Sequence, residues 1–313
     1  MVQNFVVCSE AVIPLFLFML IGMGIRRAKL LTPHEIGRVN HMVFVVFFPV
    51  MMFTNLYGHT LREIVDPHLV LFVVAVILGV YFASIPIVLK MEPSPQRRGA
   101  MIQAIYRSNF IIMGLPVAIS IFGREHLAVT MMMIAIVVPM YNVMAVITLE
   151  IFRGGSIRAG RILLRILTNP LILGAAAGLA AAAAGLHLPQ VLDGVITEMA
   201  DMTSPLALII LGASFNFKSL SHRKRDLVVC LAGKLLAVPG IGLTLAMMMG
   251  FRGVAFVTCI SIFAAPTAVS SFAMAESMGS DGELAGACVV FSSAFSIFTM
   301  FFWLFLFKNL GMF

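Results

Sequence analysis

Long apolar stretches separated by short polar connections run along nearly the whole chain. A helix that crosses a bilayer needs about 20 mostly apolar residues, because the hydrocarbon core is about 30 Å thick and each residue rises about 1.5 Å. The stretches are continuous and do not alternate, which favours helices over a barrel. Ten segments qualify: Val6–Ile25, Val39–Tyr57, Leu69–Leu89, Gly99–Phe122, Leu127–Phe152, Leu171–Leu188, Ile196–Phe215, Leu227–Met249, Val254–Ala275 and Leu284–Phe307. The pattern predicts an all-α integral membrane protein with ten transmembrane helices.

The composition supports this class and excludes others. Of the 313 residues, 61% are hydrophobic and 11% charged, whereas a globular domain is roughly 45–50% apolar and about 25% charged. The net charge of +7 does not indicate nucleic-acid binding, because the basic residues lie in short clusters between apolar stretches. The cysteines and histidines show no metal-binding spacing, and nucleophile-elbow and phosphate-loop motifs are absent. We therefore expect no enzyme, no cofactor and no metal site.

The distribution of basic residues predicts the orientation, since lysine and arginine accumulate in cytoplasmic loops. With the amino terminus outside, fifteen basic residues fall in cytoplasmic connections and four in outer ones. The outer four are Arg62, Arg124, Arg252 and Lys308. The connection between the ninth and tenth helices is an exception, because it carries only the acidic Glu276, Asp281 and Glu283. We expect a multi-pass protein of a bacterial plasma membrane with both termini outside.

An internal similarity divides the chain into two halves. A shift of 156 residues places Pro14-Leu15 on Pro170-Leu171, Pro49 on Pro205, Gly22 on Gly178 and Gly123 on Gly279. Residues 1–156 and 157–313 then each hold five helices, and an odd number forces the second half into the opposite orientation. The sequence predicts two inverted five-helix repeats, a plan found in many secondary transporters.

Two predicted helices, the fourth and the ninth, contain helix-breaking residues at equivalent positions. The fourth carries Asn109, Gly114 and Pro116, and the ninth carries Pro266 followed by Thr267. Proline removes a backbone donor, and interrupted helices in corresponding places indicate a transporter site near the midplane. Simple kinks are the alternative, since proline and glycine are common in membrane helices.

Two basic residues fall inside predicted helices. Lys234 lies in the eighth helix, where a charge at the bilayer centre costs at least about 2.5–3.5 kcal/mol. It either meets an anionic substrate, titrates, tethers a neighbouring helix or snorkels to the interface. Arg107 is a second candidate cation for a carboxylate, unless it packs against headgroups. The acidic Asp201 is expected near a helix end, which argues against a carboxylate relay. Gly174 and Gly178 predict close packing of the sixth helix.

The chain resembles a bacterial member of the auxin efflux carrier family, whose relatives include malonate and malate transporters within the bile-acid, arsenite and riboflavin transporter superfamily. The motifs that carry this resemblance are Phe48-Pro49, Asn109 with Met113-Gly114-Leu115-Pro116, Asn169-Pro170, Pro205 with Leu211-Gly212, Lys234-Leu235 with Pro239, and Pro266. The resemblance implies crossed, broken fourth and ninth helices, a scaffold bundle, a moving transport bundle and a homodimer. It also implies elevator-like transport of an organic anion. The chain departs from its relatives at Ser108 and Phe110-Ile111. We therefore expect the pocket beside Asn109 to differ from theirs in size and in substrate.

Three hypotheses follow. The first is a secondary active efflux carrier of small organic anions such as carboxylates, with Asn109, Gly114, Pro116, Pro266, Thr267, Lys234 and Arg107 at the substrate site. The second is a sodium- or proton-coupled symporter of an amphipathic substrate. The third is a membrane sensor that keeps the carrier fold without transporting. The expected partners are a small organic anion and the lipid bilayer, without nucleic acid.

Overall fold

The computed structural model describes residues 2–57, 66–123, 128–153, 159–215 and 223–313, and within these ranges it contains helices and connections without a strand. In the described ranges, seven helical spans are long and apolar enough to cross a membrane. They are Pro33–Tyr57, Pro67–Met91, Pro95–Phe122, Val129–Ile151, Gln190–Ser214, Lys224–Met248 and Gly282–Asn309. Pro170–Ala183 and Gly253–Phe263 are shorter apolar helices. The all-α membrane class is thereby confirmed.

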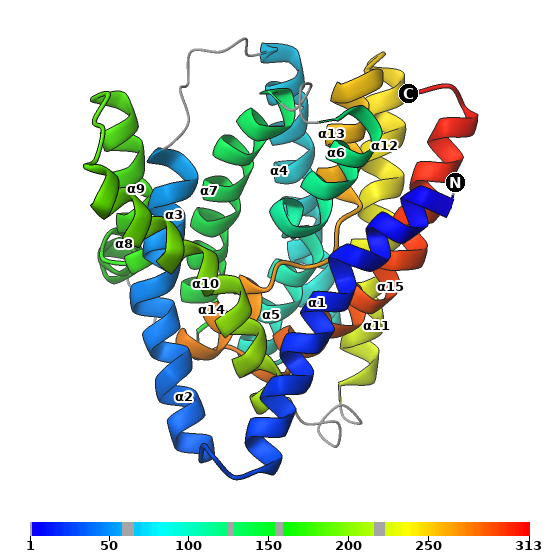
Figure 1. Ribbon diagram of the computed structural model, residues 1–313. Coiled ribbons are helices and arrows are strands. Elements are labelled where there is room, and N and C mark those ends of the chain that lie inside the picture. Colours follow the sequence, from blue (N-terminus) through cyan, green and yellow to red (C-terminus); the bar gives the residue numbers. More distant parts are fainter. Residues whose placement is uncertain (1, 58–65, 124–127, 154–158, 216–222) are drawn as a thin grey trace.

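Each of the ten predicted segments falls on one helix or on consecutive helices (Figure 1). In chain order these are α1 (Val2–Arg27); α2 (Pro33–Met42), η1 (Val43–Phe47) and α3 (Phe48–Tyr57); α4 (Pro67–Met91); α5 (Pro95–Tyr106), η2 (Phe110–Gly114) and α6 (Leu115–Phe122); α7 (Ala128–Ile151); α9 (Pro170–Ala183); α10 (Gln190–Ser214); α11 (Lys224–Ala232), η5 (Gly233–Ala237) and α12 (Val238–Met248); α13 (Gly253–Phe263) and α14 (Ser270–Ser277); and α15 (Gly282–Asn309).

Two helices differ from the expectation because hydropathy marks the membrane boundary and not the helix boundary. The connection between α7 and α9, expected to be polar, contains the short helix α8 (Ala159–Leu167). Its Leu163, Leu164 and Leu167 are exposed, as in a helix that lies along a membrane interface. Helix α10 begins six residues earlier than predicted, and this places Asp201 in the middle of the helix and not near its end.

Three π-helical turns precede prolines. The turns η1, η2 and η5 each end two residues before a proline, namely Pro49, Pro116 and Pro239. A proline ring obstructs the carbonyl four residues earlier, and a widened turn relieves this clash. For Pro239 that carbonyl belongs to Leu235, and it accepts a hydrogen bond of 3.0 Å from the Trp303 indole. The prolines therefore widen these helices without ending them.

Glycines allow two pairs of helices to approach closely. A Cβ atom at Gly22 of α1 or at Gly212 of α10 would overlap the backbone of the other helix, at Ile209 and Met19. Gly174 and Gly178 of α9 likewise face the α3 backbone, so the predicted close packing of this helix is confirmed.

Replacement of Gly178 with leucine is expected to destabilise the protein by about 2 kcal/mol or more, because overpacking at a rigid contact typically costs 1–3 kcal/mol. Its Cβ would lie 2.9 Å from the Phe53 Cα, where no flexible side chain can move aside. The thermal unfolding midpoint in detergent should fall. Gly194→Leu on α10 is the control, since a Cβ there meets nothing within 4 Å. Equal midpoints for the two variants would contradict the prediction.

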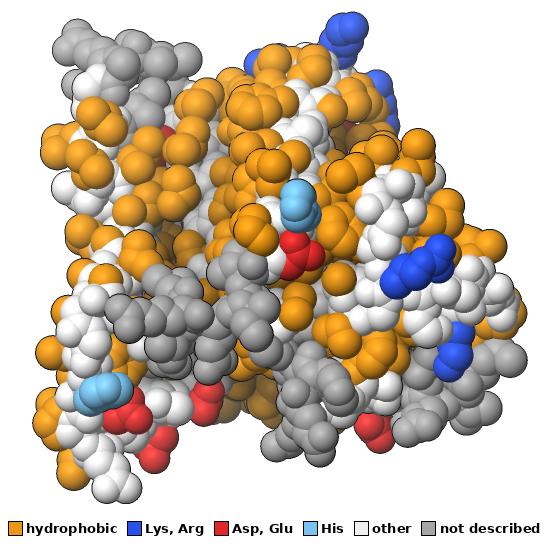
Figure 2. All heavy atoms as spheres, turned by 90° about the horizontal axis from the view of Figure 1, so that it is seen from above, with side chains coloured by type: hydrophobic (Ala, Val, Ile, Leu, Met, Phe, Trp, Pro, Cys, Tyr) orange, Lys and Arg blue, Asp and Glu red, His pale blue; other side chains and the backbone are white. Residues whose placement is uncertain are grey.

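Hydrophobic side chains dominate the outer surface. Seen from above, they cover most of the periphery, whereas charged side chains appear singly or in small groups (Figure 2). Large exposed apolar residues occur on many helices, for example Leu71 and Phe82 on α4, Ile241 on α12 and Phe298 on α15. This surface suits lipid and not water.

Candidate functional site

Two helices are interrupted near the centre of the molecule. Between α5 and η2 the backbone leaves the helical conformation, with φ −72° and ψ 145° at Arg107 and φ −83° and ψ 52° at Asn109. The break therefore lies at residues 107–109, and the helix resumes before Pro116. Between α13 and α14 the chain is irregular around Pro266, and Figure 1 shows this segment crossing the middle of the bundle. The two breaks provide backbone groups that no helix satisfies.

The two breaks contact each other directly. The backbone N–H of Asn109 donates to the carbonyl of Pro266 at 2.7 Å. The Thr267 hydroxyl donates to the carbonyl of Ala104 near the end of α5 at 2.9 Å, and the Thr267 N–H donates to the Ser292 hydroxyl at 3.0 Å. Backbone groups that have no helical partner at one break thus form hydrogen bonds with the other break or with α15.

A second contact lies one helical turn beyond the break. The Ser261 hydroxyl donates to the carbonyl of Gly114 at 2.9 Å. A Cβ at Gly114 would lie 2.6 Å from the Ser261 Cβ and 2.8 Å from its carbonyl oxygen. Only glycine lets the two interrupted helices approach this closely.

Arg107 is a buried cation with neutral partners. Its side chain is 2% exposed. One terminal nitrogen donates to Asn142 Oδ1 at 2.8 Å and to the Ser270 hydroxyl at 2.7 Å, and the other contacts Gln103 Oε1 and Met274 Sδ. In the described part of the chain, no carboxylate lies within 4.0 Å of it. The partners that the structure describes for this guanidinium are therefore all neutral.

A cavity of about 490 Å³ opens beside this guanidinium. Residues 107–109 of the first break and 268–270 of the second line it, together with side chains of α3, α7 and α10. Four buried polar atoms of lining residues have no hydrogen-bond partner among the described residues: Arg107 Nε, the Ser108 hydroxyl, the Asn109 amide nitrogen and the Asn55 amide nitrogen. Each can donate a hydrogen bond. The residues around the cavity thus hold four unpaired donors and a positive charge, together with the Asp201 carboxylate and apolar side chains such as Phe48 and Phe110.

The remaining predicted site residues lie outside this lining. Lys234 is 1% exposed, and its amine donates to the carbonyl of Phe263, the last residue of α13, at 3.5 Å. This carbonyl has lost its usual helical donor, because the Thr267 N–H bonds elsewhere. Of the predicted residues, the structure brings Arg107 and Asn109 to the cavity; for Gly114, Pro116, Pro266, Thr267 and Lys234 a substrate contact stays a prediction.

Sequence reasoning missed most polar residues of the cavity, including two asparagines and an aspartate. Asn55 and Asn142 lie within apolar helices and line it, and Asp201 of α10 does so as well. An amide inside a membrane helix is a signal that could have identified the first two. Asp201 was missed because the helix was predicted to begin too late.

The comparison with known proteins identifies the class. A family model described as membrane transport protein matches residues 7–161 and 157–304. The chain belongs to this family. A relative from Methanothermobacter thermautotrophicus, described as an uncharacterized transporter, is 25% identical over 305 residues, which cover 94% of this chain and 97% of the relative. The resemblance to the auxin efflux carrier family is thus confirmed, and the chain is a multi-pass membrane transport protein.

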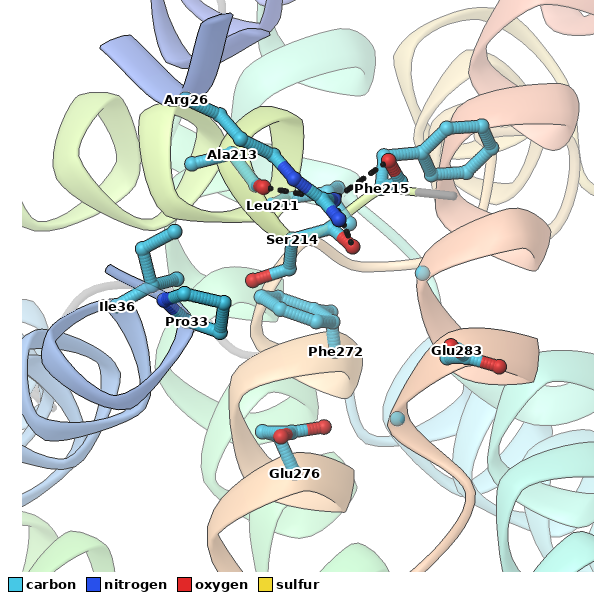
Figure 3. Close-up of a pocket in the computed structure, with 12 residues that line it drawn as sticks. Arg26, Pro33, Ile36, Leu211, Ala213, Ser214, Phe215, Phe272, Glu276 and Glu283 are labelled. Atoms are coloured by element: carbon cyan, nitrogen blue, oxygen red, sulfur yellow. Dashed lines mark hydrogen bonds between the residues drawn. The ribbon is translucent and has the colours of Figure 1, made fainter. Parts of the chain in front are cut away.

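This transporter has a second, smaller cavity of about 180 Å³ at the end of the bundle that holds the α1–α2 connection (Figure 3). Arg26 donates to the carbonyls of Ala213, Ser214 and Phe215, at 3.2, 3.3 and 3.2 Å, and so satisfies the end of α10. Glu276 also lines this cavity. Desolvation of its carboxyl raises the pKa above its ordinary value, and the negative charges of Glu283 and Asp281 raise it further.

Proposed function

We propose that this transporter carries a small organic anion with a carboxylate group, and that the anion binds in the cavity between the two broken helices. The observation that supports this most is the buried guanidinium of Arg107, whose described partners are all neutral. In our proposal Arg107 and Asn109 contact the substrate carboxylate.

A buried charge without a counterion is costly, and this cost favours an anionic ligand. Moving an ion out of water carries a penalty of several kcal/mol even after the protein relaxes. A carboxylate beside Arg107 would offset this penalty and accept hydrogen bonds from the guanidinium. The unpaired amides of Asn109 and Asn55 would supply further donors. The helix starts at Phe110 and Ser270 place partial positive charge beside the same cavity.

The proposal includes an architecture. We propose ten transmembrane helices in two inverted repeats, residues 1–156 and 157–313, in a plasma membrane with both termini outside. Alternating access would follow an elevator-like movement, and the protein would be a homodimer. Two observations support this plan: the ten predicted segments all fall on helices, and the breaks lie in the fourth and ninth of them.

Five other predicted site residues would position the cavity. In this proposal Gly114, Pro116, Pro266 and Thr267 set the approach of the two broken helices. Lys234 would hold the end of α13 through the Phe263 carbonyl and add a positive potential from outside the cavity.

A thermal-shift experiment tests the proposal. The purified protein is heated in detergent with mono- and dicarboxylates, with indole acids and with bile acids. A ligand that binds the folded state raises the unfolding midpoint, and we expect this rise with a carboxylate. It should disappear in Asn109→Ala and persist in Asn40→Ala, a buried asparagine that instead bonds the Ala273 carbonyl and Ser277. An unchanged rise in Asn109→Ala would contradict the proposed site.

A second candidate function is sodium- or proton-coupled carriage of an amphipathic substrate. It is favoured by the Asp201 carboxylate, which lines the same cavity as the residues that carry the unpaired donors. A carboxylate at such a place can hold a cation or a proton. A sodium-dependent midpoint shift that is lost in Asp201→Asn would support this function. If the protein in liposomes moves none of the tested solutes, a non-transporting sensor becomes the better explanation.

A further inference from the structure

An apolar groove of about 560 Å³ is lined by residues of α4, α11, η5 and α12. Gly79, Ala83 and Ile87 of α4 form one wall, Gly233 and Ile241 belong to the other, and Ile105 of α5 also lines it. Its wall residues Ile87 and Ile241 are 51% and 55% exposed. Both walls belong to candidate membrane spans, so the groove faces the hydrocarbon of the bilayer.

The groove is closed at one end by aromatic rings. Phe72 lines the groove near the start of α4, and its ring packs against those of Phe251 and Phe263, with centroid distances of 5.1 and 6.3 Å. From Phe72 to Ile87 the groove follows about 22 Å of helix at about 1.5 Å per residue. One leaflet of a hydrocarbon core about 30 Å thick is about 15 Å deep. A complete acyl chain therefore fits along it.

The other end of the groove leads to two basic side chains. Lys90 follows Ile87 by three residues on α4, and Arg225 precedes Val229 by four residues on α11. Residues at these spacings share one helix face. Both side chains therefore lie on the faces that form the groove, one turn beyond its apolar walls.

These two cations are available to a ligand. Lys90 and Arg225 are exposed, and neither forms an ion pair within 4.0 Å among the residues that the structure describes. The acidic neighbours Glu92 and Asp226 form ion pairs with Arg97, and Asp226 also interacts electrostatically with Arg225 beyond ion-pair distance. The mouth of the groove thus carries positive charge next to an apolar channel.

We infer that this groove is a binding site for an anionic phospholipid. One acyl chain lies between α4 and α12 with its end near Phe72, and the phosphate group lies between Lys90 and Arg225. Basic residues near the membrane surface attract anionic lipids, and the apolar walls exclude any polar occupant. A zwitterionic lipid with the same chains gains less from the two cations.

Native mass spectrometry of the detergent-purified protein tests this inference. The protein is mixed with equal amounts of phosphatidylglycerol and phosphatidylcholine that have identical chains, and the retained lipid is counted. We expect phosphatidylglycerol to be retained preferentially by the natural chain. Gly79→Leu should fill the groove and abolish this retention, because a Cβ at Gly79 meets nothing within 4 Å. Gly24→Leu, at an equally open glycine of α1, should retain lipid like the natural chain.

A second variant separates headgroup recognition from the shape of the groove. In Lys90→Gln with Arg225→Gln, the preference for phosphatidylglycerol is expected to fall at least about tenfold, since both cations are lost. These substitutions are exposed and leave the groove intact. They therefore test the inferred phospholipid site even if Gly79→Leu fails to fold. Equal retention of the two lipids by the natural chain would overturn the inference, as would full retention by a folded Gly79→Leu protein.

Discussion

Arg107→Met is expected to weaken anion binding at least tenfold while leaving the protein at least as resistant to heat as the natural chain. Hydrogen bonds to a charged group contribute about 1.5–3 kcal/mol, so the loss of the guanidinium should weaken carboxylate binding at least tenfold. Stability should not fall, because the hydrogen bonds lost at Asn142 and Ser270 are offset by the removal of a buried charge that no described carboxylate pairs. Loss of binding without loss of stability indicates that the charge serves function at a cost in stability.

Ligand binding and the unfolding midpoint without ligand are measured together. Arg107→Lys keeps the charge but loses the planar fork, so we expect intermediate affinity. Lys234→Met is the matched control, since it removes the other fully buried cation, which lies outside the cavity. It should weaken carboxylate binding less than Arg107→Met does, because Lys234 lies outside the cavity lining and contributes only a longer-range positive potential. If Lys234→Met lost binding while Arg107→Met kept it, the assignment of the substrate contact would pass to Lys234.

Gly114→Ala is expected to destabilise the protein by about 2–3 kcal/mol, the upper range for overpacking. The added methyl would lie 2.6 Å from the Ser261 Cβ and 2.8 Å from the Ser261 carbonyl oxygen, where the backbones of the broken helices meet. The direction of the change in stability is informative, because the same substitution within an exposed helix normally stabilises a protein by about 1 kcal/mol. The substrate cavity should be distorted as well, since Asn109 lies one turn away.

Gly24→Ala on α1 provides the comparison, because a Cβ there meets nothing within 4 Å. We expect its unfolding midpoint to equal or exceed that of the natural chain, whereas Gly114→Ala unfolds at a lower temperature and binds carboxylate more weakly. A Gly114→Ala protein with unchanged midpoint and affinity would show that the two helices can separate at this point without cost.

The positions of the helices could be predicted from the sequence because apolar run length is a local property. The boundaries were less accurate, as α8 and α10 show, since polar residues continue a helix beyond the membrane. The break around Pro266 was also visible, because proline affects the backbone within four residues. The break in the fourth helix was expected around Pro116, but the structure places it at residues 107–109.

The sequence by itself determined the membrane class, the location of the ten apolar segments, the two interrupted helices and the family. Only the tertiary structure decided that Arg107 lies between Asn142 and Ser270, which are 35 and 163 residues away, and that Lys234 binds the end of α13. The reason is physical. Hydrophobic periodicity fixes which stretches become helices, but the depth and rotation at which distant helices pack follow from close contacts such as Gly114 on Ser261. The buried Arg107 guanidinium with its neutral partners is a product of that packing.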